Sequence, residues 1–270
     1  MRTFRFVLAF VFGLVAAQST AHEMWIEPLE YQVSPSGQLQ AKIVNGEDFS
    51  GTSLPYLPNR FSHFIVYANG RSVQVAGRPG DVPALNMQSR DAGLHIVAYQ
   101  STVSTLTYQT WAKFQKFVDH KDFGDIRTQH DARGLPEEGF KEAYTRFSKS
   151  LIGVGPAAGA DLRIGLETEI VALTNPYVDD LSNGMRVQVF YGQTPRANVQ
   201  VEVFEKASPE AEARIFTLRT DADGIATIPV KPAMTYQLDS VVLREPSATL
   251  AAERTAAWET LWANLTFRTP

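Results

Sequence analysis

The sequence predicts a mostly β protein in which two β-sandwich domains flank a helical insertion. Short runs of alternating apolar and polar residues, bounded by Pro, Gly, Asn or Asp, dominate both ends of the chain. Between them lies a segment rich in Lys, Phe, Glu and Ala, with apolar residues at helical spacing. With 270 residues, of which 44% are hydrophobic and 20% charged, the composition is that of a globular protein of one or two domains.

The first 21 residues have the three-part pattern of a secretory signal. The basic start MRTFR precedes the apolar run FVLAFVFGLVAA, and small residues of QSTA precede a cleavage point. The apolar run is too short to span a bilayer comfortably, which favours a cleaved signal over an N-terminal membrane anchor. We therefore expect cleavage after Ala21 and a periplasmic protein that begins at His22. Cleavage after Ala17 would instead leave a glutamine at the new terminus.

Residues 22–110 are predicted to form the N-terminal β-sandwich. The runs MWIEPLEYQVSP, QLQAKIVNG, HFIVYANGRSVQV, GLHIVAYQS and TLTYQTW are typical of antiparallel strands with tight turns. The ANGR segment between two β-rich runs is a hairpin signal, because Asn-Gly suits the tightest hairpin turns. A length of roughly 90 residues is typical of a sandwich.

Residues 111–155 are predicted to form the helical insertion. TWAKFQKFVDHKDF gives one predicted helix and EEGFKEAYTRFSKSLIG a second. Pro136 and the two glutamates after it suit the first turn of the second helix. Its apolar residues recur at i, i+3, i+4, i+7 and i+11, at Phe140, Ala143, Tyr144, Phe147 and Leu151.

Residues 156–270 are predicted to form the C-terminal sandwich, after the bend region GVGPAAGAD. Strand, polar turn, strand and then RTDADGIATIPV make up a transthyretin-like or carboxypeptidase-regulatory-like pattern. DADG lacks the remaining ligands of a calcium loop, so we interpret it as a structural turn that uses the conformational freedom of Gly224. WETLWANLTF is predicted to be a final edge strand with Trp258 and Trp262 against the core.

The composition limits the possible chemistry. A net charge of -4 and a pI near 5.8 give no electrostatic footprint for nucleic acid. Because the chain has no cysteine, any metal must be held by His, carboxylate, Met or backbone groups. The sequence has no G-x-S-x-G elbow, H-E-x-x-H helix, phosphate-binding loop or dinucleotide fingerprint, so we expect a protein that is not an enzyme.

Two of the five histidines are candidate metal ligands. If cleavage frees the amine of His22, that amine and the ring Nδ1 can chelate one ion. Such a pair suits copper, nickel or cobalt, which favour nitrogen donors. His95 lies in the strand GLHIVAYQS, from which its ring could reach the N-terminal strand and complete a three-nitrogen histidine brace.

The other possible ligands are weaker candidates. His63 fits a surface cross-strand pair equally well, and His120 and His130 lie in the charged insertion, where DHKD is expected to face solvent. Glu23, Met24 and Glu27 are close enough to His22 to be auxiliary ligands. Strand alternation places Glu23 and Trp25 on one face, and Met24 and Ile26 on the other.

The chain resembles the family catalogued as domain of unknown function 4198. The resemblance lies in AHEMWIEP, GLHIVAYQS, FKEAYTRFSKSLIGVG, TDADG and WETLWANLTF, in that order, and covers essentially the whole mature chain. Each motif is short, so the specificity comes from the series. Some members are associated with periplasmic nickel or cobalt uptake beside energy-coupling-factor-type transporters, which implies metal binding without catalysis. The resemblance carries over His22 and His95, whereas members often have a further His-Met pair where this chain reads QLDSVVLREP.

The function predicted from these residues and from the resemblance is periplasmic binding of nickel or cobalt, as an accessory to a membrane transporter. Three alternatives remain open at this point. The same site could serve copper handling, or it could be the copper brace of an enzyme that oxidises polysaccharides. The chain could also be a metal-free structural or adhesion module, since a fold does not specify a function.

Overall fold

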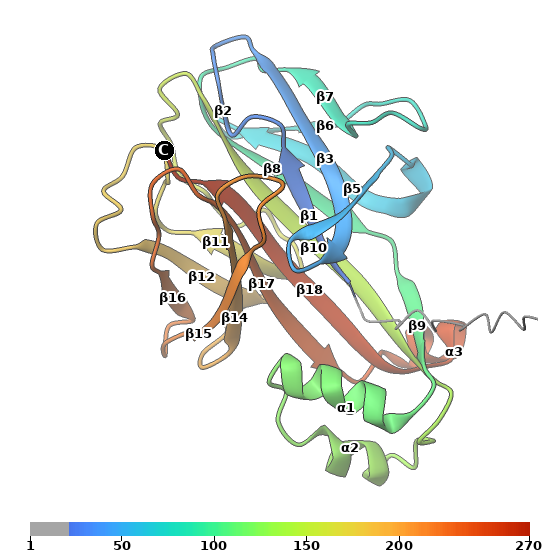
Figure 1. The fold of residues 1–270 in the computed structure, drawn as a ribbon. Coiled ribbons are helices and arrows are strands. Elements are labelled where there is room, and N and C mark those ends of the chain that lie inside the picture. The colour runs from blue at the N-terminus through green and yellow to red at the C-terminus, as the bar shows by residue number, and fades with distance from the viewer. Residues whose placement is uncertain (1–21) are drawn as a thin grey trace, which may run out of the picture.

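The computed structural model describes residues 22–270, so the predicted signal at 1–21 and its cleavage point lie outside the described residues. Strands make up 49% of the structure and helices 11%, which confirms the prediction of a mostly β protein. The strands of the described part form three sheets (Figure 1).

A ten-stranded sheet forms the middle layer of the molecule. Eight strands follow the order β15-β14-β17-β18-β10-β8-β5-β6, and β2 and β9 also pair with β10. The two long central strands, β10 and β18, run parallel to each other. The strands of this sheet are β2 (Gln32–Val33), β5 (Phe61–Ala68), β6 (Arg71–Gln74), β8 (Gly93–Ser101), β9 (Ser104–Tyr108), β10 (Phe140–Val154), β14 (Gln200–Lys206), β15 (Arg214–Arg219), β17 (Thr235–Arg244) and β18 (Ala256–Arg268).

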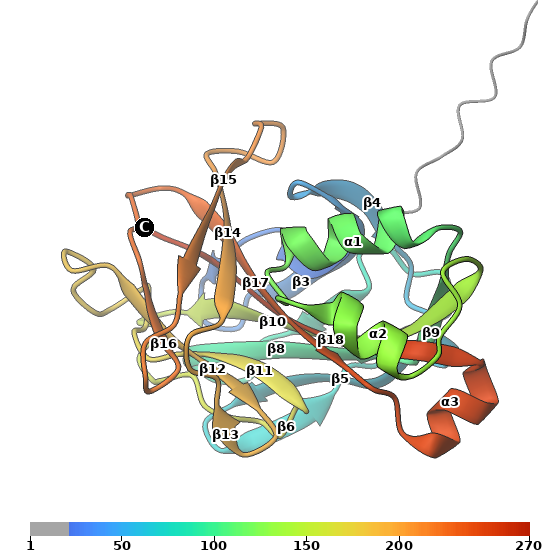
Figure 2. The ribbon, with the colours of Figure 1, turned by 90° about the horizontal axis from the view of Figure 1, so that it is seen from below.

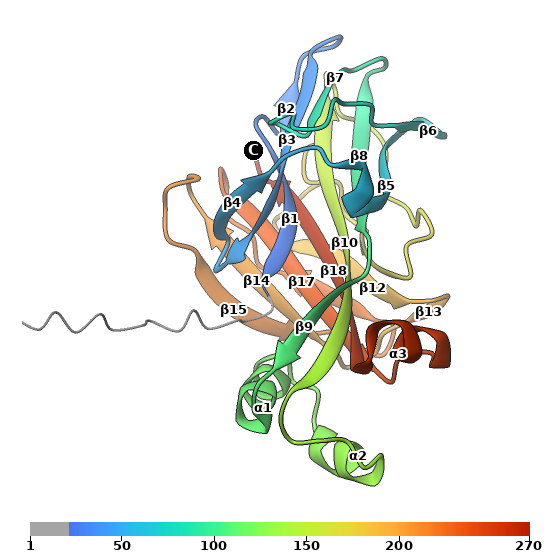
Figure 3. The ribbon, with the colours of Figure 1, turned by 90° about the vertical axis from the view of Figure 1, so that its right-hand side faces the viewer.

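A second sheet covers one face of the middle layer. It consists of β1 (Glu23–Pro28), β3 (Gln38–Glu47), β4 (Ser50–Leu54) and β7 (Leu85–Gln88), in the order β1-β3-β4 with β7 also on β3. Met24 and Ile26 pack with Phe64, Val97 and Ile152 in an apolar core between the two sheets. Figure 3 shows β1, β3 and β4 on one side of β10 and β18.

The third sheet packs on the opposite face of the middle layer. It consists of β11 (Thr168–Ala172), β12 (Met185–Tyr191), β13 (Thr194–Pro195) and β16 (Ile225–Ile228). Val187 of β12 shares a core with Leu151, Leu238 and Leu265 of the middle layer. Strands from both predicted sandwiches thus belong to one continuous sheet. The division at residues 22–110, 111–155 and 156–270 stays a prediction.

Two helices, α1 (Trp111–His120) and α2 (Ile126–Ala132), lie together beyond one end of the strands (Figure 1), and Figure 2 views the molecule from that end. The short elements η1 (Pro58–Arg60) and α3 (Ala248–Arg254) precede β5 and β18. Phe114 and Val118 of α1 pack against Trp258, so the amphipathic pattern predicted this helix correctly.

The second predicted helix is wrong, because its residues form the strand β10. β10 pairs with β18 on one side and with β8 and β9 on the other, and it is buried on both faces. Such a central strand need not alternate apolar and polar residues, and its Glu, Lys and Arg side chains are accommodated by buried hydrogen bonds and ion pairs. Tertiary pairing therefore overrides a spacing that fits a helix.

The final strand is also placed differently from the prediction. β18 lies between β17 and β10 in the centre of the sheet rather than at an edge, although Trp258 and Trp262 are buried as expected. Both predicted turns are confirmed. Asn69 and Gly70, at φ 49° and 76°, connect β5 to β6, and Gly224, at φ 74°, follows Asp221, whose carboxylate accepts the amides of Asp223 and Ile225.

Candidate functional site

The start of β1 is held against the middle layer by side chains instead of by a neighbouring strand. Among the described strands, β1 is at the edge of its own sheet and pairs with β3 alone. Arg146 donates to the carbonyl oxygen of His22 through both Nε, at 3.1 Å, and Nη2. Ser148 Oγ donates to the carbonyl of Met24 at 2.8 Å. Thr266 Oγ1 donates to the carbonyl of Ile26 at 2.6 Å.

His22 itself lies opposite Glu47 of the neighbouring strand β3. The pairing of Glu23 with Gly46 fixes this register, and Nδ1 of His22 is 3.5 Å from Oε1 of Glu47. Both side chains are about half exposed, yet the Nδ1 atom is shielded from solvent and makes no hydrogen bond within the described chain. The ring nitrogen Nδ1 of His22 and the carboxylate oxygen Oε1 of Glu47 thus face each other at the start of the described chain.

His95 lies far from His22. It is buried in β8, where Nδ1 is 3.2 Å from the carbonyl oxygen of Gly93, and burial lowers the pKa of its ring. His95 pairs in register with Ile152 of β10, whereas His22 is held by Arg146 of the same strand. Six residues of β-strand between 146 and 152 correspond to about 20 Å. The structure therefore does not bring the two predicted ligands into one site.

The surroundings of His95 are also unfavourable for a cation. The cavity that its ring lines has a volume of about 80 Å³. Arg71 and Arg90 line the same cavity, against the single acid Asp91. Metal binding at His95 stays a prediction, but as a residue separate from His22.

The remaining histidines have different environments. His63 is exposed beside Ser62. His130 is completely buried, where it accepts a hydrogen bond from Trp258 Nε1 at 3.1 Å and contacts the carbonyl of Pro136 at 3.0 Å. His130 is therefore part of the apolar core beneath the two helices. His120 is about half exposed and hydrogen-bonds Glu202 at 2.9 Å.

The side chain of Glu23 enters a buried cluster of charged groups at the base of α1. Lys121 Nζ lies 3.3 Å from Glu23, 2.6 Å from Glu202 and 3.1 Å from Asp239. All four side chains are less than 10% exposed. The expectation that DHKD faces solvent is wrong for Lys121, because α1 ends directly above these carboxylates. Met24 points to the other face, into the apolar core, which confirms the predicted alternation along β1.

Three carboxylates around one lysine leave a surplus of acid. Burial raises the pKa of Glu23 to about 7, because Lys121 only partly compensates for the loss of water. Burial also raises the pKa of Asp239. For Glu202, burial is outweighed by hydrogen bonds from His120 and Lys121, which lower its pKa. Glu202 is therefore the member held most firmly as an anion, and its hydrogen bond raises the pKa of His120.

Two buried carboxamides adjoin this cluster on the middle layer. Asn264 pairs in register with Asp239, and Gln237 lies two residues before Asp239 on β17. Both amide atoms of each side chain lack a hydrogen bond within the described residues, although both residues are at most 2% exposed. A buried side-chain amide that makes no hydrogen bond lowers the stability of the folded state, because it has lost its hydrogen bonds to water.

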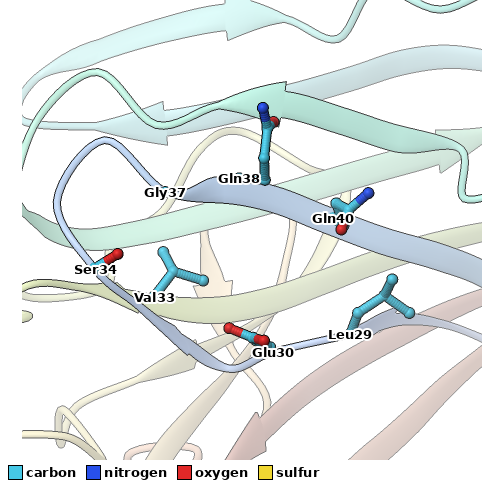
Figure 4. A pocket seen from close by; sticks show the side chains of 7 residues that line it. All are labelled: Leu29, Glu30, Val33, Ser34, Gly37, Gln38 and Gln40. Atoms are coloured by element: carbon cyan, nitrogen blue, oxygen red, sulfur yellow. The ribbon is translucent and has the colours of Figure 1, made fainter.

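The described part of the chain has larger pockets elsewhere. A groove of about 540 Å³ lies near the C-terminus, where Lys42, Lys206 and Arg268 face Glu27 and Glu30. Another pocket, of about 360 Å³, lies beside the start of β3, where Figure 4 shows Gln38 and Gln40 on the strand and Glu30 on the preceding segment. Neither pocket is lined by a histidine.

Sequence reasoning missed Glu47, Arg146 and Lys121. Glu47 could have been found by pairing HEMWIEP with AKIVNGE as an antiparallel hairpin-like ladder. Arg146 lies in the second predicted helix, and no local pattern in the sequence indicates that its residues form a strand. Among residues 22–270, no group of three or more His, Asp or Glu side chains is arranged to hold a metal ion. Within the same residues, no helix is long and apolar enough to cross a membrane.

A comparison with models of protein families gives a match. The family model described as "Domain of unknown function (DUF4198)" matches residues 19–243, most of the chain. A comparison with curated proteins finds no match.

Proposed function

The chain belongs to the DUF4198 family, and on this premise we propose that it is a periplasmic transition-metal-binding protein, accessory to nickel or cobalt uptake by a membrane transporter. The family has no assigned function, so the transport role rests on the resemblance to members associated with nickel and cobalt uptake. The proposed role is binding and transfer without catalysis. The description of the fold as two β-sandwiches, the second transthyretin-like, belongs to the same proposal.

The observation that carries the proposal is the pairing of His22 with Glu47. Two ligand atoms bound to one ion at about 2.0–2.2 Å lie roughly 3.0–3.4 Å apart. Nδ1 of His22 and Oε1 of Glu47 are 3.5 Å apart, so a shift of a few tenths of an ångström would let both contact one ion. If cleavage falls after Ala21, the new amine of His22 supplies a third donor. A site with two nitrogen donors and one oxygen donor suits nickel, cobalt or copper.

His95 is not part of this site, because it lies about 20 Å away along the strand direction. The proposal therefore replaces the three-nitrogen brace by an amine, an imidazole and a carboxylate. The ion is cargo, and its half-exposed ligands allow it to be passed to a partner.

The first experiment combines mass spectrometry of the exported protein with calorimetric titration of nickel, cobalt and copper. We expect a mature N-terminus at His22 and a loss of affinity of at least about tenfold in both His22→Ala and Glu47→Gln. His63→Ala is the matched control, since it removes an exposed imidazole from another strand. A chain that retains Ser19, Thr20 and Ala21 should lose affinity as His22→Ala does, because its amine is displaced.

Unchanged affinity in His22→Ala would refute the site. Tighter binding of copper alone would not identify the cargo, because copper outcompetes nickel at most nitrogen sites. Uptake of radioactive nickel or cobalt by cells that carry the wild-type or the His22→Ala protein separates the alternatives. Equal uptake by both would refute the role in transport of these metals.

A further inference from the structure

The side chain of Arg146 donates hydrogen bonds to the carbonyl oxygen of His22, the residue on which the proposed metal chelate depends. Arg146 is buried and donates through Nε and Nη2 to the same oxygen of His22. The guanidinium carbon lies 4.4 Å from the ring centre of Tyr144 and 5.9 Å from that of Trp262. These aromatic contacts fix the planar group in one orientation.

A chain that begins with histidine offers a metal ion more than one way to bind. The amine can chelate together with the ring Nδ1, together with its own carbonyl oxygen, or together with the next peptide nitrogen after that nitrogen loses its proton. A flexible peptide can use all three modes. The geometry around the first peptide bond therefore decides which donors are present at the site.

The fold removes two of these three modes. The carbonyl oxygen of His22 already accepts from Arg146. In an antiparallel ladder, alternate residues direct both backbone groups toward the partner strand. Since the carbonyls of His22, Met24 and Ile26 face the middle layer, the amide of Glu23 faces β3, where Glu23 pairs with Gly46. The ring Nδ1 is the donor that remains beside the amine.

We infer that Arg146 is a positioning residue that directs a divalent transition-metal ion to the amine and ring of His22 by withholding the carbonyl oxygen and fixing the first peptide plane. This inference rests on the proposed metal-binding function. It assigns to a buried arginine the choice of coordination mode, which the ligands alone do not determine. The Ser148 and Thr266 contacts hold the same strand edge, but their carbonyls belong to residues beyond the reach of the amine.

The visible absorption spectrum tests this inference, because its bands depend on the donor atoms of copper or nickel. The mature protein is loaded with one equivalent of copper or nickel and compared with the free peptide HEMWIEP, which has the same terminus and no arginine. We expect the two spectra to differ, with the bands of the peptide at shorter wavelength at pH 8, where peptide nitrogens become ligands. Identical spectra would overturn the inference without the need for any variant.

Variants then locate the effect at Arg146. In Arg146→Gln we expect a spectrum shifted toward that of the peptide and an affinity weakened by about tenfold, and in Arg146→Lys, which keeps the charge but loses the two-donor fork, a partial shift. Ser148→Ala removes an equivalent side-chain bond two residues along and should keep the wild-type spectrum. Circular dichroism shows which variants are folded.

The outcomes distinguish the two proposals. If His22→Ala loses the metal while Arg146→Gln keeps both the wild-type spectrum and affinity, the metal site stands and the role of Arg146 is refuted. If Ser148→Ala shifts the spectrum as much as Arg146→Gln, general loosening of β1 explains the effect and the role of Arg146 is refuted as well. If His22→Ala binds as wild type does, the proposed function itself fails.

Discussion

Lys149 and Lys121 are both buried among carboxylates, and the surroundings of the two lysines differ in their balance of charge. Lys149 Nζ lies 2.8 Å from Asp161 and 3.0 Å from Glu169, and all three side chains are at most 1% exposed. Their carboxylates also accept backbone amides, from Leu162 and Ala172 at Asp161 and from Ile164 at Glu169. Lys149 thus completes a cluster in which backbone donors share the neutralisation of charge.

The cluster around Lys121 has a different balance. It places three carboxylates around one lysine, and its outer member Glu202 contacts the half-exposed His120. It is adjoined by Gln237 and Asn264, two carboxamides that make no hydrogen bond in the described part of the chain. A buried lysine therefore stabilises its cluster most where backbone donors also satisfy the remaining carboxylate oxygens.

The largest expected effect is that of Lys149→Met. Removal of the ammonium leaves Asp161 and Glu169 buried without a cation, so we expect a loss of about 3–5 kcal/mol in the free energy of unfolding. Urea denaturation at pH 7, followed by tryptophan fluorescence, measures it. A loss below about 1 kcal/mol would show that the backbone donors alone neutralise the cluster.

Lys121→Met should lower the free energy of unfolding by less, about 2 kcal/mol at pH 8. In this variant Glu202 keeps its hydrogen bond with His120, and the other carboxyl groups of the cluster can take up protons. For the same reason, the cost should be smaller at pH 5.5 than at pH 8. Denaturation curves of wild type and variant at both pH values give the two differences. An equal or larger cost than that of Lys149→Met would contradict the comparison.

Glu142 shows how burial changes the pKa of a carboxyl group that has hydrogen-bond donors but, within the described chain, no ion pair with a lysine. It accepts hydrogen bonds from Tyr108 and Thr260, but burial still raises its pKa from 4.5 to about 6. The folded state therefore holds the proton more tightly than the unfolded chain, and the contribution of Glu142 to stability falls as pH rises from about 4.5 to 6. The fall should reach at most about 2 kcal/mol.

Glu142→Gln should remove this contribution and flatten the dependence of unfolding free energy on pH in that interval. Denaturation at intervals between pH 4.5 and 7 measures the slope. A slope that persists unchanged in the variant would assign the titration to another group. Glu137→Gln, at an exposed position on the same segment, is the control.

The smallest expected effect is that of Asn264→Leu, a replacement with the same number of side-chain heavy atoms. Because neither amide atom of Asn264 makes a hydrogen bond within residues 22–270, we expect the unfolding free energy to change little or to rise by up to about 1 kcal/mol. A matched change at a satisfied amide, Asn175→Leu, should destabilise the protein, since its side chain donates to Ala157 and Gly159. A loss in Asn264→Leu as large as in Asn175→Leu would contradict this expectation.

The sequence was informative where the signal was local. The ANGR and DADG turns, the amphipathic α1 and the alternation along β1 could all be predicted because neighbours in the chain determine them. The strand β10 could not, because its conformation depends on pairing with β18 more than a hundred residues later. The same holds for the cluster of Lys121, which joins residues from β1, β14, β17 and the end of α1.

For the candidate site, the sequence pointed to His22 as a ligand but not to its surroundings. The partner Glu47 follows from the β1–β3 register, and the contact with Arg146 follows from the crossing of β1 over the middle layer. The sequence predicts that the ring of His95 reaches the N-terminal strand, but strand patterns alone do not determine which strands are neighbours. The register of β8 on β10 places it about 20 Å further along the strand direction.

The central position of β18 has a consequence for how the chain acquires its fold. Ribosomes release the N-terminus first, and domains fold as their residues emerge. Since Ala256–Arg268 separate β17 from β10, the middle layer stays in two pieces until almost the last residue is available. During that interval both long strands expose unpaired backbone, and removal of Ala256–Arg268 would leave two unpaired sheet edges in place of one continuous sheet.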